Sequence, residues 1–541
     1  MTPGIKSTLV GLVALLAATS WRPALAAPSV AVPRQWDHAA LEGDVFYQIF
    51  VRSFADSDGD GIGDLKGLTS KLDYLNDGNP ATTSDLGVEG IWLMPIFESP
   101  SYHGYDTVDY LSIDKEYGSL ADFRAFLDAA HQRGIRVIVD FVMNHSSAQH
   151  PWFLASASTP QSPYRDWYVW RGDDPGWRQP WGGGPVWHKN PFGDGQLYYG
   201  VFWSGMPDLN FAHPPVRQEM QQIAAHWRAF GVDGFRLDAT RHLFANGPGD
   251  AQNDQPETHA FLREFASHLR ELAPDTILVG ENWTTTDKIA QYFGDTAQIH
   301  GGDQLPLSFN FPLADAIVKG VAEETAFGIG EVLAAMQELY PAGVLDAPFL
   351  RNHDMMRLAS ELGADPGKEK LAAAILLSLP GVPFLYYGEE VGLRNGGSDR
   401  DDRLKRTPMP WNGGPGGGFT RGEPWFPFAP GREQENVATQ ENDQASLLTA
   451  YQKLIHLRAS SPALRHGRLE LVSSGGSDLL AFLRRDTQEA VLVVHNLTAQ
   501  PRQLRLPAGL ELAEKPLFGA AARSGRELLL APRASVFWRL R

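Results

Sequence analysis

The chain has 541 residues, of which 43% are apolar and 21% charged, so it can build one large folded domain and one or two smaller ones. Its formal net charge of -17 argues against nucleic acid and anionic membranes as partners, and is neutral evidence on an uncharged substrate. There is no cysteine, so disulfides cannot stabilise the protein in an oxidising compartment.

The N-terminal segment has the pattern of a secretory signal peptide, which we predict over residues 1–26. Lys6 supplies a positive start, an apolar run extends from Leu9 to Ala18, and "ALA" at 24–26 marks a cleavage site. The run is too short for a comfortable membrane span, and the cleavage pattern disfavours the alternative of an uncleaved anchor. We therefore expect a periplasmic or secreted protein.

Eight short apolar runs predict a parallel β-barrel. Helical stretches separate the runs, and in one of them Phe123, Phe126 and Leu127 recur at the spacing of a helix face. Strands that alternate with helices in this way indicate an α/β fold, a (β/α)8 TIM barrel, predicted over 36–143 and 213–462. The predicted strands are residues 44–51, 88–96, 135–142, 232–239, 276–281, 305–311, 347–354 and 381–388.

Two segments depart from this alternation. The connection after the third strand is long and rich in Trp, Gly and Pro, and such loops are usually functional. We predict an inserted domain there, over 144–212, which overhangs the open end of the barrel. A second irregular stretch, 394–440, is expected to form loops over the same face. From 463 to 541 short alternating runs between turns predict a C-terminal antiparallel β-sandwich domain.

Three acidic residues each end one of the predicted strands: Asp238, Glu281 and Asp354. Carboxylates at the C-terminal ends of barrel strands build active sites, and acids from different strands suit glycoside cleavage. We assign Asp238 as the nucleophile, because Arg236 on the same strand face favours its ionised form. We assign Glu281 as the general acid/base, because its apolar run should desolvate it and raise its pKa. A purely structural Arg236–Asp238 pair and a helix-start role for Glu281 are the alternatives.

The segment "DSDGDGIGD" (56–64) repeats the first part of an EF-hand loop, with carboxylates at positions 1, 3, 5 and 9 and a carbonyl at 7. Position 12 is Gly67 rather than Glu, so the loop is not a complete EF-hand. Clustered hard oxygens predict Ca²⁺, and an Asp-rich turn without an ion is the alternative. The predicted ligands are Asp56, Asp58, Asp60, Ile62 and Asp64.

Seven segments together resemble the α-amylase family of glycoside hydrolases over nearly all of the chain after the signal peptide. Each segment alone is a weak signal, but seven in the family's order leave little room for coincidence. The segment "MPDLN" resembles the version in bacterial α-amylases intermediate between oligo-1,6-glucosidases and neopullulanases. The segments are "DFVMNH" (140–145), "GFRLDATRH" (234–242), "GEN" (280–282), "FLRNHD" (349–354), "SYHGYDTVDY" (101–110), "GVPFLYYGEE" (381–390) and "MPDLN" (206–210).

The resemblance implies roles for further residues. Asp354 matches a third carboxylate that binds sugar hydroxyls and favours the transition state. His145 and His353 match histidines that bind the sugar beside the cleaved bond, and Tyr105 matches its aromatic platform. The substrate-binding residues expected on this basis are Tyr105, His145, Arg236, His353, His103, Asp106, Arg241 and His242.

Arg241 and His242 stand where α-amylases usually carry Lys-His, and we expect them to face the leaving-group side. Arg and Lys are not interchangeable, so the geometry of that contact is open. The 56–64 loop also resembles the calcium loop of oligo-1,6-glucosidase relatives. A second calcium site, with Asn144 and the His242 carbonyl, is implied by the family alone, and some related bacterial enzymes lack it.

The resemblance implies a retaining α-amylase that cleaves internal α-1,4-glucosidic bonds of starch, glycogen and maltooligosaccharides. Relatives that trim chain ends carry a pocket-closing Asp where this chain has Tyr102, so Tyr102 favours an open cleft. The alternatives are an exo-acting α-glucosidase or maltose-forming enzyme, a transglycosylating relative such as a trehalose synthase, and a non-catalytic carbohydrate-binding or transporter-associated member of the fold. We expect a monomer with an α-glucan as its partner, and neither nucleic acid nor a membrane.

Overall fold

The computed structural model of the protein describes residues 34–398 and 400–541. The signal peptide predicted for residues 1–26 lies outside the described residues. Within the described part, none of the helices combines the length and the hydropathy needed to cross a membrane.

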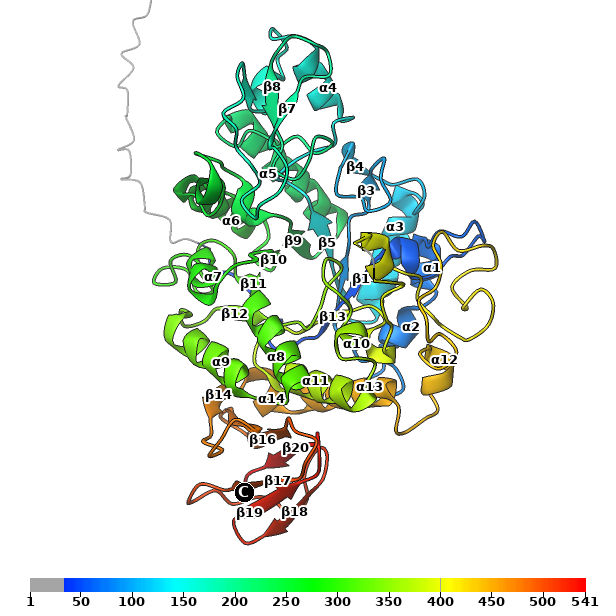
Figure 1. Cartoon of the computed structure of the whole chain (residues 1–541), viewed down its shortest axis with the longest axis vertical. Coiled ribbons are helices and arrows are strands. Elements are labelled where there is room, and N and C mark those ends of the chain that lie inside the picture. The colour runs from blue at the N-terminus through cyan, green and yellow to red at the C-terminus, as the bar shows by residue number, and fades with distance from the viewer. Residues whose placement is uncertain (1–33, 399) are drawn as a thin grey trace, which may run out of the picture. The chain divides into compact units, whose positions relative to one another are not determined.

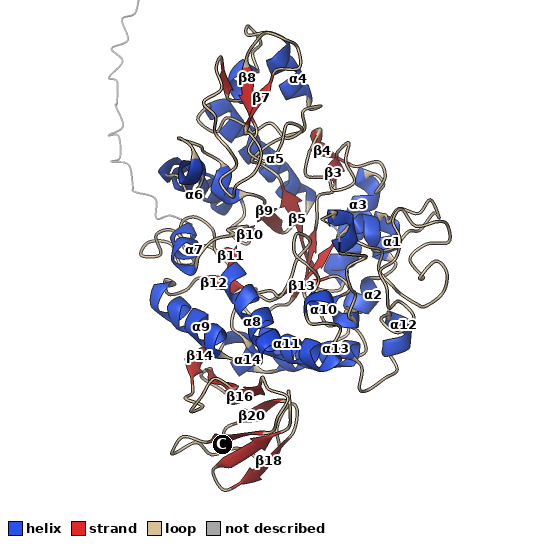
Figure 2. Ribbon diagram, in the orientation of Figure 1, coloured by secondary structure: helices blue, strands red, loops and turns tan. Residues whose placement is uncertain are grey.

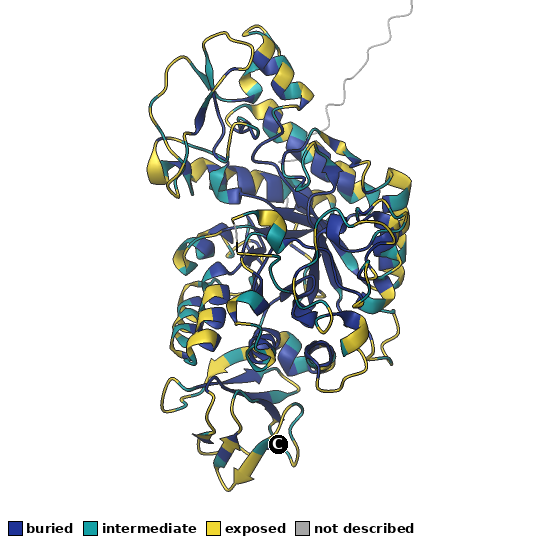
Figure 3. Ribbon diagram, turned by 45° about the vertical axis from the view of Figure 1, so that its right-hand side comes forward, coloured by how far each residue is buried: buried dark blue, intermediate teal, exposed yellow. Residues whose placement is uncertain are grey.

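Eight parallel strands form a nearly closed barrel with helices around it (Figures 1 and 2). They pair in the order β12-β11-β10-β9-β5-β2-β1-β13, and an isolated parallel bridge between Phe349 and Phe384 joins the two ends of this row. The strands are buried along almost their whole length and contribute side chains to two apolar clusters (Figure 3). Both faces of the sheet are thus covered, which explains why the runs are largely hydrophobic. The barrel predicted from the sequence is confirmed. Its strands are β1 Phe46–Ile49, β2 Gly90–Leu93, β5 Arg136–Phe141, β9 Gly234–Leu237, β10 Ile277–Gly280, β11 Leu307–Phe309, β12 Leu345–Ala347 and β13 Phe384–Tyr386.

The seventh predicted strand, 347–354, is misplaced. β12 pairs with β11 only as far as Ala347, because Pro348 has no N–H to donate to the ladder. The Pro348 carbonyl still accepts from the Phe384 amide at 2.9 Å, which helps to close the barrel. Asp354 therefore lies in the loop after β12 and does not end a strand.

The helices follow local signals in the sequence. Ser119 and Asp122 form a capping box at the start of α3, whose buried face includes Phe123, Phe126 and Leu127 as predicted. Gly231 ends α5 with a φ of 106°, a left-handed conformation that glycine adopts without strain. The barrel helices are α1 Leu65–Thr69, α2 Leu72–Leu75, α3 Leu120–Gln132, α5 Pro214–Phe230, α6 Pro256–Leu272, α7 Thr286–Tyr292, α8 Phe311–Glu323, α9 Phe327–Leu339, α10 Leu358–Glu361, α11 Pro366–Ser378, α12 Val437–Gln440, α13 Leu447–Ser460 and α14 Pro462–His466.

The long connection between β5 and α5 forms the inserted domain expected after the third barrel strand. It contains α4 Pro151–Ser158 and a three-stranded antiparallel sheet in the order β6-β8-β7. Val186, Trp187, Tyr199 and Val201 form a small apolar cluster of its own. The strands are β6 Trp170–Arg171, β7 Trp187–Lys189 and β8 Leu197–Tyr199, and a hairpin of β3 Phe97–Glu98 and β4 Asp109–Ile113 precedes the domain in the chain.

The C-terminal residues form two antiparallel sheets, in the orders β14-β15-β16-β20 and β17-β19-β18. Side chains from both sheets share one apolar cluster, as expected for a β-sandwich. The predicted fold class is confirmed in this part as well. The strands are β14 Arg468–Leu471, β15 Leu479–Arg485, β16 Ala490–Asn496, β17 Arg502–Arg505, β18 Ala521–Ser524, β19 Glu527–Leu530 and β20 Ser535–Arg539.

One buried arginine holds the end of the barrel to the helix that follows it. Arg458, in α13, is fully buried and donates to the carbonyls of Gly43, Leu377, Leu379 and Gly381 at 2.7–3.0 Å. These carbonyls lie in the last turn of α11 and in the segments before β1 and β13, so one side chain satisfies backbone groups that would otherwise be buried without donors.

We therefore predict that Arg458→Met destabilises the protein by about 3 kcal/mol or more, because it leaves buried carbonyls without partners. Calorimetry should show a clearly lower Tm. Arg468→Met, at an exposed position of β14, is the matched control and should leave Tm nearly unchanged. Equal Tm values for the two variants would contradict this account.

Candidate active site

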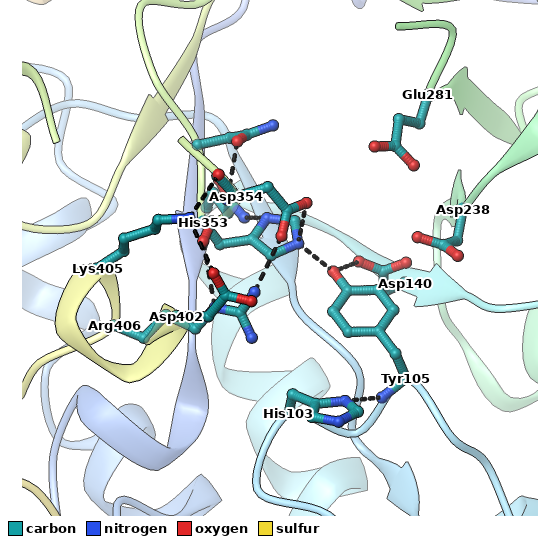
Figure 4. Close-up of polar contacts among 12 residues, drawn as sticks. His103, Tyr105, Asp140, Asp238, Glu281, His353, Asp354, Asp402, Lys405 and Arg406 are labelled. Atoms are coloured by element: carbon teal, nitrogen blue, oxygen red, sulfur yellow. Dashed lines mark hydrogen bonds and ion pairs between the residues drawn. The ribbon is translucent and has the colours of Figure 1, made fainter. Parts of the chain in front are cut away.

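Four carboxylates lie close together at the C-terminal end of the barrel (Figure 4). Asp238 directly follows β9 and Glu281 directly follows β10, two strands that pair along their whole length. Asp140 lies near the end of β5, on the other side of β9. Asp354 reaches the same place from the loop after β12. The three acids predicted from the sequence are thus brought together, although only two of them end strands.

The guanidinium of Arg236 contacts three of these carboxylates. Its Nη1 donates to Asp140 Oδ1 at 2.7 Å and to Asp238 Oδ1 at 2.6 Å, and its Nη2 lies 2.9 Å from Glu281 Oε2. Arg236 is only 1% exposed, so these contacts lie out of water, where charge-assisted hydrogen bonds are strong. The Ala239 amide adds a second donor to Glu281 Oε2 at 3.0 Å.

Burial controls the acidity of Asp238 and Glu281. It raises the pKa of Asp238 to about 7, with Arg236 opposing the rise and Asp140 and Asp354 adding to it. It raises the pKa of Glu281 to about 7 in the same way, with Arg236 opposing and Asp238 adding. The expectation that Arg236 keeps Asp238 simply ionised is thus incomplete, since desolvation and like charges outweigh the guanidinium. The charge of Asp238 is one of the causes that raise the pKa of Glu281, so the ionisation of Glu281 depends on that of Asp238.

The rings of Tyr105 and His353 are stacked, and His353 lies next to Asp354. Their rings lie 5.4 Å apart and nearly parallel, and the Tyr105 hydroxyl lies 2.5 Å from His353 Nε2 and donates to Asp140 Oδ2 at 3.0 Å. Gln48 Nε2 donates to His353 Nδ1 at 2.8 Å, which places the ring proton on Nε2. Burial, with Arg406 and Arg236 nearby, lowers the pKa of His353 well below its usual value. His353 is therefore a neutral donor toward this site.

A cavity of about 740 Å³ opens in front of these groups. Most of the residues predicted from the sequence line it. Three do not: Arg236 and His353 lie behind the wall, and Asp106 binds the hydroxyl of Ser99 at 2.8 Å. The predicted residues on the wall are His103, Tyr105, His145, Asp238, Arg241, His242, Glu281 and Asp354.

Two residues on the wall use their polar atoms differently from the expectation. His145 donates from Nε2 to the Tyr105 carbonyl at 3.0 Å, and burial lowers its pKa to about 3, so it is neutral. Arg241 binds both carboxylate oxygens of Asp254 at 2.8 Å and donates to the Trp283 carbonyl at 2.6 Å. Its donors are thus directed at the protein rather than into the cavity.

Sequence reasoning missed several residues of the site. Asp140 lies inside the third predicted run, two residues before its end, so the rule that identified acids at strand ends passed over it. Asp402 and Arg406 come from the irregular stretch 394–440, whose sequence does not indicate which residue turns inward. Arg406 donates to Asp354 Oδ1 at 2.9 Å, and Lys405 bridges the Asp354 carbonyl and the Asp402 carboxylate (Figure 4). The aromatic residues on the wall carried no sequence signal that set them apart: the exposed Trp181, Trp203 and Trp283 and the partly buried Phe202.

The Asp-rich loop gathers oxygen atoms as a cation site requires. Carboxylate oxygens of Asp56, Asp58 and Asp64 lie within 4.8 Å of one another, while Asp60 is not part of this group. Backbone amides of the loop turn toward the carboxylates, as from Gly61 to Asp56 at 2.9 Å. Within the described residues, no Lys or Arg forms an ion pair with the three, and their carboxylates accept from backbone amides and hydroxyls. The residues fit Ca²⁺, a hard ion that prefers carboxylate oxygens.

Known proteins resemble this chain along most of its length. Residues 48–467 match the family model of the α-amylase catalytic domain, and residues 479–536 match that of the α-amylase SusG C-terminal domain. "Alpha-amylase 3" of Dictyoglomus thermophilum is 41% identical, over 84% of either chain. "Trehalose synthase/amylase TreS" of Mycolicibacterium smegmatis is 35% identical, over 85% of either chain. The solved structure of an α-amylase from H. orenii superposes with a TM-score of 0.80 at 39% identity, and covers 92% of this chain and 99% of its own.

We predict that kcat/KM has a bell-shaped dependence on pH, in which the ionisation of Asp238 and Glu281 sets the two limbs. Arg236→Met removes the guanidinium that lowers the pKa of both groups, so the acid limb should move to higher pH. The maximum should fall by about a hundredfold or more, as when other fixed electrostatic partners are removed. Arg133→Met, whose partner Asp73 lies at the surface, is the control and should leave the profile in place. An unmoved acid limb in the Arg236 variant would refute this role of the guanidinium.

Proposed function

The chain belongs to the α-amylase family of glycoside hydrolases, and on that premise we propose that it is a retaining α-amylase. It would cleave internal α-1,4-glucosidic bonds in starch, glycogen and maltooligosaccharides. The observation that carries the proposal is the pair Asp238 and Glu281, held by one guanidinium at the ends of adjacent strands and facing one cavity.

The proposed reaction uses the two carboxylates in turn. Asp238 attacks the anomeric carbon while Glu281 gives its proton to the leaving oxygen, which forms a glycosyl ester on Asp238. Glu281, now ionised, takes a proton from water, and the hydroxide oxygen breaks the ester with overall retention. Because the pKa of both groups is raised to about 7, one proton on the pair near neutral pH leaves one group to attack and the other to donate.

Arg236 would serve both steps. As the ester forms, Asp238 loses its negative charge while Glu281 becomes ionised, and the guanidinium contacts both carboxylates. A donor already fixed between them needs no rearrangement as charge moves from one to the other. Asp354, held by Arg406, would bind sugar hydroxyls beside the reacting carbon.

Internal cleavage is supported by Tyr102. Its ring stacks on Trp425 at 5.6 Å, at the position where chain-end-trimming relatives carry a pocket-closing Asp. A second candidate is an exo-acting or transglycosylating enzyme. Contacts of Lys405 with the Asp402 carboxylate and the Asp354 carbonyl favour this second candidate. They can close one end of the cavity. The resemblance to a trehalose synthase/amylase points the same way.

We further propose that Asp56, Asp58, Asp60, Asp64 and the Ile62 carbonyl bind Ca²⁺. The convergence of three of these carboxylates, without a protein cation among the described residues, supports the site. Bound Ca²⁺ would offset the repulsion between the carboxylates and hold the loop between β1 and α1 in place. Small shifts of this turn would bring Asp60 and the Ile62 carbonyl to the ion.

We also propose that the protein is exported. The signal-like pattern of residues 1–26 supports this, and a glucan polymer is too large to cross a membrane unaided. Calcium binding outside the cytoplasm would agree with such a location.

Calcium removal should lower thermal stability. Excess Ca²⁺ should raise Tm by several degrees over a chelator-treated sample, since saturating a site that only the folded state offers adds about 3 kcal/mol at 100 times Kd. Asp58→Ala should abolish most of this gain, whereas Asp73→Ala, a surface acid paired with Arg133, should keep it. If chelator and Ca²⁺ give the same Tm in the unaltered protein, the site does not bind Ca²⁺.

The activity itself is tested by a time course on amylose whose reducing ends are blocked, with products resolved by size. We expect mixed maltooligosaccharides from the first minutes, and a loss of at least about 10⁴-fold in Asp238→Asn, which lacks the nucleophile. Asp233→Asn is the matched control, because this carboxylate lies at the opposite end of β9, bound to the Val137 amide. Glucose or maltose as the sole early product would instead establish the exo-acting candidate.

A further inference from the structure

The short segment 405–407 carries the basic side chains that contact Asp354 in the cavity (Figure 4). Arg406 Nη2 donates to Asp354 Oδ1 at 2.9 Å, and Lys405 Nζ donates to the Asp354 carbonyl at 2.9 Å. The segment belongs to the irregular stretch 394–440, where neither a sheet nor a long helix sets the path of the backbone. Its position must therefore be fixed by other contacts.

Each of the three carbonyls of this segment accepts from a buried side chain of another part of the chain. Arg357 Nε and Tyr386 Oη donate to the Lys405 carbonyl, at 2.8 and 3.0 Å. Ser53 Oγ donates to the second carbonyl at 2.5 Å, and Tyr387 Oη donates to the third at 2.8 Å. All four donors are at most 2% exposed, so water does not compete for these carbonyls. Three successive peptide units are thus held from outside the loop.

Arg357 brings a buried positive charge to this task. Besides the Lys405 carbonyl it binds the Tyr387 carbonyl through Nη1 at 2.7 Å, and its guanidinium carbon lies 4.2 Å from the ring centre of Tyr386. Glu389 offsets the charge from farther away. Burying a guanidinium is costly, and an apolar side chain could fill the space without that cost. The donors that Arg357 offers to two carbonyls give its charge a purpose.

The donors come from the frame of the barrel. Tyr386 is the last residue of β13 and Tyr387 directly follows it, and both belong to the segment "GVPFLYYGEE" (381–390), which the proposed reaction does not otherwise use. Ser53 ends the short helix η1 Val51–Ser53, just after β1. Because β1 and β13 pair with each other, the carbonyls are tied to two adjacent strands rather than to another loop.

We propose that Arg357, Tyr387 and Ser53 are positioning residues, which fix the backbone of 405–407 so that Arg406 holds Asp354 at the reacting sugar. This inference rests on the proposed glycosidase function. An ion pair fixes a carboxylate only as well as its cation is itself fixed, and an arginine on a free loop would follow Asp354 away from the sugar. Anchoring the carbonyls on both sides of Arg406 removes that freedom before the substrate binds.

A double-mutant cycle on kcat/KM for maltopentaose tests the proposal. Arg406→Met alone should lower kcat/KM about a hundredfold, as for the loss of a fixed electrostatic partner. Arg357→Met alone should lower it about thirtyfold, mainly through kcat, since Asp354 is expected to act on the transition state. Adding Arg357→Met to Arg406→Met should change kcat/KM by less than about threefold, because no guanidinium is left to position. Losses that multiply in the double variant would overturn the proposal.

Milder variants decide the matter if Arg357→Met does not fold. Tyr387→Phe and Ser53→Ala each remove one hydroxyl, and each should lower kcat/KM about threefold alone but leave it unchanged in the Arg406→Met background. Arg357→Lys should recover part of the loss of Arg357→Met, because an ammonium can still donate to the Lys405 carbonyl. Full activity in the Arg357, Tyr387 and Ser53 variants would contradict the positioning role.

Arg458→Met is the matched control. Arg458 is also a buried arginine that donates to backbone carbonyls, but these include Gly43 and Gly381, which precede β1 and β13 at the opposite end of the barrel. Its Tm should fall, whereas kcat/KM measured well below Tm should stay within about twofold. A loss as large as that of Arg357→Met would mean that general destabilisation lowers the activity, and the proposal would fail.

The same measurements separate this inference from the function on which it rests. If the unaltered protein does not hydrolyse maltopentaose, the glycosidase function itself fails and the positioning role with it. Hydrolysis by the unaltered protein, together with multiplying losses in the cycle, rejects the positioning role alone.

Discussion

The site depends on one buried charge. Arg236 lies inside the barrel, and an isolated ion in that position would cost many kilocalories per mole in lost hydration. Its guanidinium is therefore surrounded by Asp140, Asp238 and Glu281, from three adjacent strands. The rings of Trp92 and Tyr105 add aromatic faces at 5.2 and 5.8 Å from the guanidinium carbon. The same contacts that satisfy Arg236 also fix the positions of Asp238 and Glu281.

The barrel supplies the fixed part of the site and its loops supply the rest. Adjacent strands place carboxylates within reach of one guanidinium because strand spacing is set by hydrogen bonding and does not vary. Loops can differ without disturbing that frame. The loop after β12 brings Asp354, the 394–440 stretch brings Arg406 to hold it, and the inserted domain brings Trp181. This division explains how similar barrels carry α-amylase and trehalose synthase names among the relatives.

The cavity wall has a polar part and an aromatic part. Around Asp354 and Arg406 the wall is charged and hydrogen-bonded, which suits fixing the hydroxyls of the sugar that reacts. Around Trp181 and Trp283 it presents exposed aromatic rings. Asp238 and Glu281 lie on the same cavity wall, where burial raises the pKa of both carboxyls to about 7.

The sequence by itself determined the barrel and the inserted and C-terminal β domains, because buried parallel strands are continuous apolar runs. It also singled out Asp238 and Glu281, because each acid directly follows such a run. It could not determine where β12 ends, since Pro348 breaks the ladder inside a run that looks uniform. Nor could it determine that Arg241 would bind Asp254 instead of a sugar, that Arg406 would reach Asp354, or that burial would outweigh Arg236 in setting the pKa of Asp238. Those outcomes depend on distances between residues remote in the chain and on the exclusion of water, which only the folded tertiary structure decides.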